Sequence, residues 1–539
     1  MKSAFRRGLG TEEGNGILAD APRPPFAAGV VLTLATLNFA LHMIVLAVTP
    51  YGIQRDAFLY FAMGDHLRLW HMDFPPLIAI MGNIQTAIFG HTLAAARIFP
   101  ALEGCAILIT AALIARELGG GRFAQGLATL PMFTAGIFLR PANLFQPVVL
   151  DQLWWTLALL FLARVARADA EGNRGAGRNA WLAFGLAMGL GLLTKFSILF
   201  IGLAILGALL ATRLRRALAT PWPWVAAAIA FAIGSPSIVG QINLGFPVAG
   251  QMDSLKASQL VHVSYASFVL GQPLMTGFIA WLVSIIGAAA LLAWKPLRPY
   301  RVVGLACIFA FALLMVLHGK AYYVGPIYPT LFAAGAVWLD GARLGRVPSV
   351  PRVFRWGVVA GMITEGALTL PIALPILSPE HTAVYIARLG LEGANATNWG
   401  GTDLIPQDFA DQLGWERQVE TVARVYNSLS PAEQSETVIG ADNYGEAGAL
   451  EFFGPRYHLP PVVCGCGSYW YFGPGTRPGN VLIDVGTDSV ELATIWRDVQ
   501  LAARIRSPWS VLEERDVPVW IARDPRITLQ EAWPTIQGS

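Results

Sequence analysis

The chain has 539 residues, of which 55% are hydrophobic and only 14% are charged, and its formal net charge is +3. This composition excludes an ordinary soluble globular protein, and so small a net charge gives no indication of nucleic-acid binding. The four cysteines exclude a disulfide-rich scaffold. The sequence therefore predicts a membrane protein built from several apolar helices.

The first apolar segment, residues 26–48, is long enough to cross a bilayer and lacks a small-residue cleavage site, so we expect a retained transmembrane helix. In the polar run that follows, residues 53–76, apolar side chains recur every three or four positions. This spacing is typical of a helix that lies on the membrane surface. Asp56 lies in its first turn, next to Arg55, where the helix start favours a carboxylate. An acid held at the membrane face is a candidate for chemistry on a lipid-borne substrate.

Apolar segments continue through the next 330 residues or so at roughly helical span lengths. They lie at residues 98–115, 123–138, 148–163, 180–194, 196–211, 222–240, 271–293, 302–317, 324–339 and 354–377. Together with the first segment they predict about eleven transmembrane helices. The segments 180–194 and 196–211 are short, so we expect Lys195 between them at the top of a tight helical hairpin.

Basic residues are divided unevenly between the two sets of helix ends. One set is much the larger and includes Lys2, Arg6, Arg7, Arg116, Arg122, Arg174, Arg301, Arg343, Arg346 and Arg352. The other set holds only Arg55, Arg68, Arg97, Arg140, Lys195, Lys256 and Lys320. Because basic loops stay in the cytoplasm, we expect a cytoplasmic N-terminus and, with an odd number of spans, an external C-terminus.

The residues from 378 to 539 are more polar and are expected to form a small α/β domain outside the membrane, after a membrane domain of residues 1–377. Their pattern predicts an amphipathic helix at 407–429, strands at 437–441 and 481–485, and helical stretches near 445–453 and 490–501. Cys464 and Cys466 are either a disulfide or two free thiols.

Four charged residues fall on the outer side in this topology: Asp56, Asp151, Lys195 and Lys320. Each one alone has an ordinary structural explanation, such as an acid at a helix start or a lysine that reaches the membrane interface. Two acids and two lysines at one face of a chain with few charges instead favour a functional site.

Phosphate is the ligand that these cations would suit. We expect Lys195 and Lys320 to bind a phosphate group, with Tyr322 or Tyr323 as hydrogen-bond donors and with Arg97 and Arg55 as further substrate contacts. A divalent metal is a weaker alternative. It would use His66, His71 and Asp73, whose spacing is not diagnostic, so we expect no cofactor.

Several motifs, in this order, resemble a known family. They are RDAFLYF, DFPPLIA, RIFPAL, LLTKFS, GKAYYVGPIYP, QDFADQLGWE and NYGEAGALEFFGPRY. The chain resembles the bacterial members of glycosyltransferase family 39. These polytopic enzymes of the GT-C type are similar to protein O-mannosyltransferases and to the lipid A aminoarabinose transferase.

The resemblance implies roles for particular residues. Asp56 matches the acid regarded as the catalytic base in the first outer loop, although Ala57 stands where the family usually has a glutamate. Lys320, Tyr322 and Tyr323 match the element taken to meet the lipid phosphate. Asp151 resembles a second acid, and we expect it to bind substrate by positioning the sugar or the acceptor.

We therefore expect an inverting glycosyltransferase in the bacterial inner membrane. It would move a sugar from a polyprenyl phosphate donor to a hydroxyl of an envelope lipid, glycan or protein on the periplasmic face. The alternative is a transporter or flippase that moves a lipid-linked sugar without chemistry, for which we find no repeated halves. A third reading, a membrane-anchored binding module, would make the C-terminal domain the active part.

Overall fold

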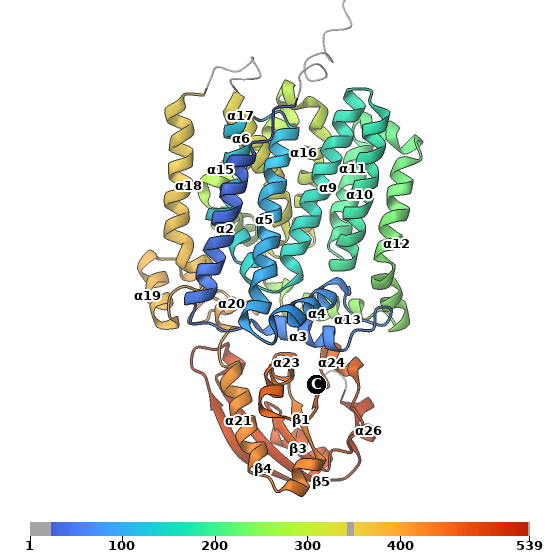
Figure 1. Cartoon of the computed structure of the whole chain (residues 1–539), viewed down its shortest axis with the longest axis vertical. Helices are drawn as coiled ribbons and strands as arrows, with labels where there is room; N and C mark the ends of the chain where they lie inside the picture. Colours follow the sequence, from blue (N-terminus) through green and yellow to red (C-terminus); the bar gives the residue numbers. More distant parts are fainter. Residues whose placement is uncertain (1–22, 342–349, 537–539) are drawn as a thin grey trace, which may run out of the picture.

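The computed structural model describes residues 23–341 and 350–536. Long helices form a bundle, and a smaller α/β domain covers one end of it (Figure 1). We call the residues from 378 onward the tail domain. The helices α3 (Arg55–Asp65) and α4 (Leu77–Phe89) lie at the end of the bundle that faces the tail domain (Figure 1). A helix is therefore present in the expected segment, but it covers only Arg55–Asp65, and its residues 57–64 are buried rather than exposed on one face.

Within the described ranges, six helical segments are long and apolar enough to cross a membrane. They are α2 (Ala28–Val48), α5 (Leu93–Glu117), α9 (Pro147–Ala170), α12 (Trp222–Asn243), η4 with α16 (Lys295–Val316) and α18 (Arg352–Ala373). Two bent helix pairs raise the number to eight if each is one span. The pairs are α11 (Ile198–Leu210) with η2 (Arg213–Ala219), and α14 (Tyr265–Thr276) with α15 (Phe278–Ala293).

The sequence predicts about eleven transmembrane spans, whereas the described part of the chain contains six to eight candidate spans. The expected span 123–138 divides into three short helices, because Pro131 and the extended Ala135 interrupt it. The expected span 324–339 divides into a 3₁₀ turn and a helix in the same way, next to Pro326 and Pro329. The hairpin around Lys195 is confirmed.

The remaining helices of the bundle are shorter or begin in polar sequence. They are α6 (Arg122–Thr129), α7 (Pro131–Thr134), α8 (Gly136–Leu139), η1 (Pro141–Asn143), α10 (Arg174–Thr194), α13 (Pro247–Ser258), η3 (Leu260–His262), η5 (Ala321–Ile327) and α17 (Tyr328–Asp340).

The tail domain contains a five-stranded sheet with the order β2-β1-β3-β5-β4. The strands are β1 (Thr437–Ala441), β2 (Val462–Val463), β3 (Val481–Val485), β4 (Trp496–Arg506) and β5 (Asp516–Pro525). The first three strands are parallel, and β5 is antiparallel to both β3 and β4. The main helices are α19 (Pro379–Leu389), α20 (Gln407–Ala410), α21 (Trp415–Asn427), α22 (Pro431–Glu436), α23 (Tyr444–Phe453), α24 (Gly467–Phe472) and α25 (Ser489–Ile495).

The two expected strands of the tail domain are confirmed as β1 and β3, but two of the helix predictions need correction. The single helix expected at 407–429 is interrupted at Gly414, whose φ of +95° suits glycine alone. The helix expected at 490–501 ends at Ile495, because the residues that follow pair with β5. Cys464 and Cys466 form a disulfide.

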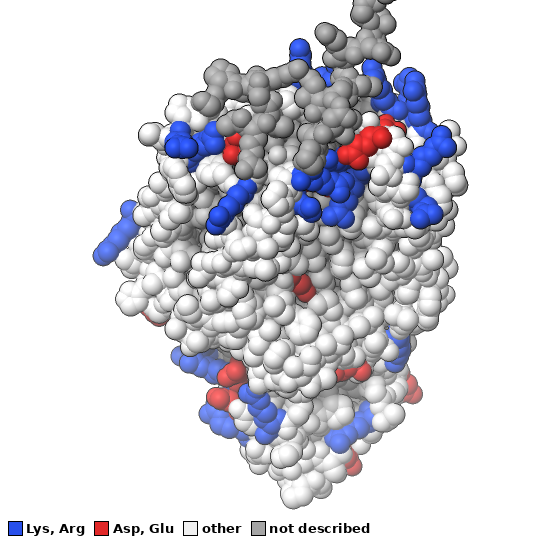
Figure 2. Space-filling view, turned by 45° about the horizontal axis from the view of Figure 1, so that its top comes forward, with Lys and Arg blue, Asp and Glu red and all other residues white. Residues whose placement is uncertain are grey.

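Charged residues lie mostly at the two ends of the molecule. On the face drawn in Figure 2, Lys and Arg side chains gather at the end of the bundle opposite the tail domain, and a mostly uncharged belt follows. Of the basic residues noted in the sequence, Arg116 lies in the last turn of α5, and Arg174 and Arg301 begin α10 and α16. Lys2, Arg6, Arg7, Arg343 and Arg346 lie outside the described residues.

Helix α3 is packed between α4 and the tail domain, and its aromatic side chains enter a core that the two parts share. The ring of Phe58 lies 5.8, 5.7 and 5.6 Å from those of Trp415, Phe452 and Phe453. Close approach of α23 to α3 requires glycine, because a Cβ at Gly448 would lie 2.6 Å from the Cβ of Phe58. The tail domain is thus built onto α3.

This packing predicts that Gly448→Ala weakens the contact between α3 and the tail domain. The added methyl group also meets the backbone of Phe58, which cannot rotate away, and such overpacking costs about 1–3 kcal/mol. We expect a lower melting temperature and faster proteolysis of the tail domain in the purified protein. Gly393→Ala is the matched control, because an added Cβ there meets nothing within 4 Å. Equal melting temperatures for the two variants would contradict this packing.

Candidate active site

The start of α3 holds the carboxylate of Asp56 in one orientation. Gln54 caps the helix, its side-chain oxygen accepting from the backbone N–H of Asp56 at 2.9 Å. The Oδ1 atom of Asp56 accepts from the hydroxyl of Tyr444 at 2.8 Å, and Oδ2 accepts from the amide of Gln146 at 2.9 Å. Both oxygens therefore have a neutral donor, and the side chain stays partly exposed.

Neither of these two donors was among the residues picked out from the sequence. Gln146 is the residue just before α9, and its amide also reaches the side-chain oxygen of Gln54 at 3.1 Å. Tyr444 opens α23, far from Asp56 in the chain. The motif that contains Tyr444 carried part of the family resemblance, but nothing in its spacing connects it to Asp56.

Lys320 lies in the short connection between α16 (Arg301–Val316) and η5 of the bundle. Its ammonium group donates to the side-chain oxygens of Gln259 at 2.5 Å and Asn398 at 2.7 Å. Both acceptors are neutral amides, so the positive charge is held in place without being neutralised. Burial, with a contribution from the charge of Lys195, lowers the pKa of Lys320 to about 8, while the charge of Asp56 acts in the opposite direction. The three residues therefore share one electrostatic environment.

Lys195 lies where α10 ends and the chain becomes extended. Its Nζ atom is 5.4 Å from the centre of the Tyr323 ring, a cation–π arrangement. The Tyr322 and Tyr323 rings are themselves in edge contact at 4.8 Å. The residue before Lys195 is anchored by Trp154, whose indole N–H donates to the hydroxyl of Thr194 at 2.9 Å. Like Asp56 and Lys320, Lys195 and the two tyrosines remain partly exposed.

Asp151 is almost completely buried, with 6% of its surface exposed. Its Oδ2 atom accepts from the hydroxyl of Ser197 at 2.7 Å, two residues beyond Lys195. Asp151 is thus buried next to the turn of the hairpin that carries Lys195, and its charge can orient that turn. It does not lie among the partly exposed side chains of the site.

Arg55 and Arg97 do not join the two lysines. Arg55 turns to the tail domain and forms ion pairs with Asp411 at 3.4 Å and Glu513 at 2.8 Å. Arg97 is only 3% exposed and donates to the carbonyl of Gly52 at 3.0 Å and to the side chain of Gln412 at 2.8 Å.

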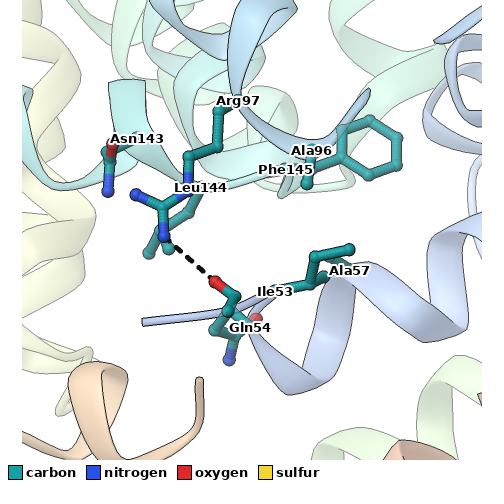
Figure 3. A pocket seen from close by; sticks show the side chains of 9 residues that line it. Ile53, Gln54, Ala57, Ala96, Arg97, Asn143, Leu144 and Phe145 are labelled. Atoms are coloured by element: carbon teal, nitrogen blue, oxygen red, sulfur yellow. Dashed lines mark hydrogen bonds between the residues drawn. The ribbon is translucent and has the colours of Figure 1, made fainter. Parts of the chain in front are cut away.

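Figure 3 draws the guanidinium of Arg97 beside Asn143 and above the segment that contains Gln54. The gap that these residues line has no room for a water molecule. Arg97 therefore holds the segment that precedes Asp56. This role differs from the substrate contact expected from the sequence.

The possible metal ligands are engaged separately. His66 pairs with Glu451 at 2.8 Å, and Asp73 accepts from Ser468 at 2.7 Å. In residues 23–341 and 350–536, no group of three or more His, Cys, Asp or Glu side chains is arranged to hold a metal ion.

Comparison with known proteins gives a family match over part of the chain. Residues 73–239 match the family model described as dolichyl-phosphate-mannose-protein mannosyltransferase. The match covers less than a third of the chain, and over that stretch the chain is similar to this family. No curated protein matches the chain.

The fold is similar to that of a solved structure. The crystal structure of ArnT from Cupriavidus metallidurans bound to undecaprenyl phosphate matches with a TM-score of 0.56 and 16% identity, covering 92% of this chain and 98% of ArnT. The apo oligosaccharyltransferase of Archaeoglobus fulgidus matches with a TM-score of 0.48 and 14% identity, covering 84% of this chain and 66% of that one.

Proposed function

We propose that this protein is a glycosyltransferase that moves a sugar from a polyprenyl phosphate to an acceptor hydroxyl, with Asp56 as general base. The acceptor oxygen forms a bond to the anomeric carbon as its proton passes to Asp56. The bond between that carbon and the phosphate oxygen breaks, and its electron pair leaves with the phosphate. Attack from the side opposite the leaving group inverts the anomeric carbon.

The observation that carries this proposal is the shared surroundings of Asp56, Lys195 and Lys320. The charges of Asp56 and Lys195 both act on Lys320, and all three side chains remain partly exposed. One carboxylate and two cations are the groups that the transfer needs, a base for the attacking hydroxyl and positive charge for the departing phosphate.

The two lysines would stabilise the negative charge that grows on the leaving phosphate. Tyr322 and Tyr323 would donate hydrogen bonds to its oxygens, as the family resemblance implies. ArnT, which shares the fold, was crystallised with undecaprenyl phosphate, and we infer a carrier of the same class here. Asp151 would act indirectly, through Ser197 and the Lys195 hairpin.

The charge distribution supports an assignment of the two faces. Basic helix ends lie opposite the tail domain, and basic loops remain in the cytoplasm. We therefore place the N-terminus in the cytoplasm and both the tail domain and the transfer reaction on the periplasmic side. Nucleotide sugars are not found there, so a membrane-carried donor is the appropriate substrate.

Deletion of the gene tests the function directly. Mass spectrometry of envelope lipids, glycans and exported proteins should reveal one glycosylated product that disappears in the deletion strain. Expression of the wild-type protein should restore it, while the Asp56→Asn variant should not. An unchanged set of glycosylated molecules, with a lipid-linked sugar displaced between the two leaflets, would instead support a flippase.

The pKa of Lys320 predicts a pH dependence of phosphate binding. The lysine carries its charge below about pH 8 and loses it above. We expect the dissociation constant of undecaprenyl phosphate to rise as the pH increases through 8, by up to about tenfold per pH unit. Lys320→Arg should remove this dependence, because a guanidinium stays charged throughout. The same pH profile for both proteins would exclude Lys320 from the phosphate site.

A further inference from the structure

The segment that leads into Asp56 is attached to the tail domain. The backbone N–H of Gly52 donates to the carbonyl of Gln412 at 3.0 Å, and that of Arg55 donates to the carbonyl of Asp411 at 3.1 Å. Arg97 joins the same two segments from the bundle side. The segment that directly precedes Asp56 is therefore fixed by residues that lie some 360 positions away in the chain. Ordering this segment costs conformational entropy.

The tail domain also reaches the carboxylate itself, through Tyr444. This tyrosine is held at the first turn of α23, where Asn443 caps the helix and accepts from the N–H groups of Gly445 and Glu446. A Cβ at Gly445 would lie 2.5 Å from the side chain of Arg55, so α23 approaches the start of α3 as closely as glycine allows. The helix start that carries Tyr444 is therefore held in a fixed position next to α3.

We propose that Tyr444 and Gln146 are positioning residues that hold the Asp56 carboxylate for proton transfer, so that the tail domain completes the active site. This inference rests on the proposed role of Asp56 as the base. A carboxylate has about four acceptor positions, and the two donors occupy one on each oxygen. The remaining lone pairs stay available to the acceptor hydroxyl. The two hydrogen bonds also restrict rotation of the carboxylate.

Tyr444→Phe tests this role because it removes one hydroxyl and leaves the ring in place. We expect kcat to fall by about 10- to 100-fold, the usual effect of losing a hydrogen bond to a charged group. The dissociation constant of undecaprenyl phosphate and the melting temperature should change little. The assay would use membrane vesicles from the deletion strain, where unconsumed lipid-linked donor remains.

Tyr469→Phe is the matched control. Its hydroxyl also donates to a carboxylate of the tail domain, Glu451 at 2.7 Å, but that carboxylate lies outside the group around Asp56. We expect near-wild-type kcat for this variant. An equal loss of kcat in both variants would mean that Tyr444 acts only through the stability of the domain, and would overturn the inference.

A double variant separates this inference from the proposed function. If Tyr444 acts through Asp56, then Tyr444→Phe should have no further effect on kcat in an Asp56→Asn background. Wild-type kcat in Tyr444→Phe together with an inactive Asp56→Asn would overturn the positioning role alone. Full activity in Asp56→Asn would instead overturn the base itself. Additive losses would show that the two residues act independently, which also contradicts the inference.

Discussion

Asp56→Asn is expected to lower kcat by about 10²- to 10⁴-fold, the usual share of general base catalysis. The amide has almost the same shape as the carboxylate but cannot accept the proton of the acceptor hydroxyl. Because it can still hydrogen-bond to Tyr444, the start of α3 should keep its conformation. The rate would be measured as formation of the glycosylated product in membrane vesicles from the deletion strain.

Asp65→Asn is a suitable control for that measurement. Asp65 ends the same helix but is exposed, and it lies at the opposite end of α3 from Asp56. We expect this variant to retain wild-type kcat. The melting temperature of Asp56→Asn should also match that of the wild type, so that slow transfer is not caused by unfolding. Near-normal transfer by folded Asp56→Asn would exclude Asp56 as the base.

Removal of both lysines, in Lys195→Ala with Lys320→Ala, should weaken undecaprenyl phosphate binding on the order of 100-fold. Each ammonium contributes a charge-assisted contact to the phosphate, and both are partly screened by water because the site is open. The dissociation constant can be measured with the purified protein in detergent, without knowledge of the sugar or the acceptor.

Lys256→Ala serves as the control for this loss. Lys256 is an exposed lysine of α13, paired only with Asp253 at 3.3 Å, and its removal changes the net charge without touching the site. The dissociation constant of undecaprenyl phosphate from Lys256→Ala should stay within about twofold of the wild-type value, since exposed ion pairs contribute little. If Lys256→Ala weakened binding as much as the double variant, the effect would be general electrostatic attraction rather than a phosphate site.

The helix that carries Asp56 and the hairpin that carries Lys195 could be predicted, because both follow from local sequence patterns. The helix start favours an acid, the apolar spacing marks a surface helix, and the short segments around Lys195 require a hairpin. The strands β1 and β3 were equally clear, since each is a continuous apolar run between turns. The broad fold and the three charged residues therefore follow from local patterns and from charge distribution.

The contacts made by the tail domain could not be predicted in this way. The hydrogen bond from Tyr444 to Asp56 joins residues 388 positions apart, and no periodicity encodes such a pairing. The contacts of Arg97 could not be predicted for a related reason: a basic residue at a helix start is equally suited to a ligand and to a carbonyl of a distant loop. Its hydrogen bond to Gln412 of the tail domain is seen only in the structure.

The most direct test of the central claim is a cryo-electron microscopy structure of the full chain with undecaprenyl phosphate. The phosphate should lie between the ammonium groups of Lys195 and Lys320, with the carboxylate of Asp56 facing the same space and still bonded to Tyr444. A phosphate bound at the opposite end of the bundle, or one separated from Asp56 by packed helices, would contradict the account.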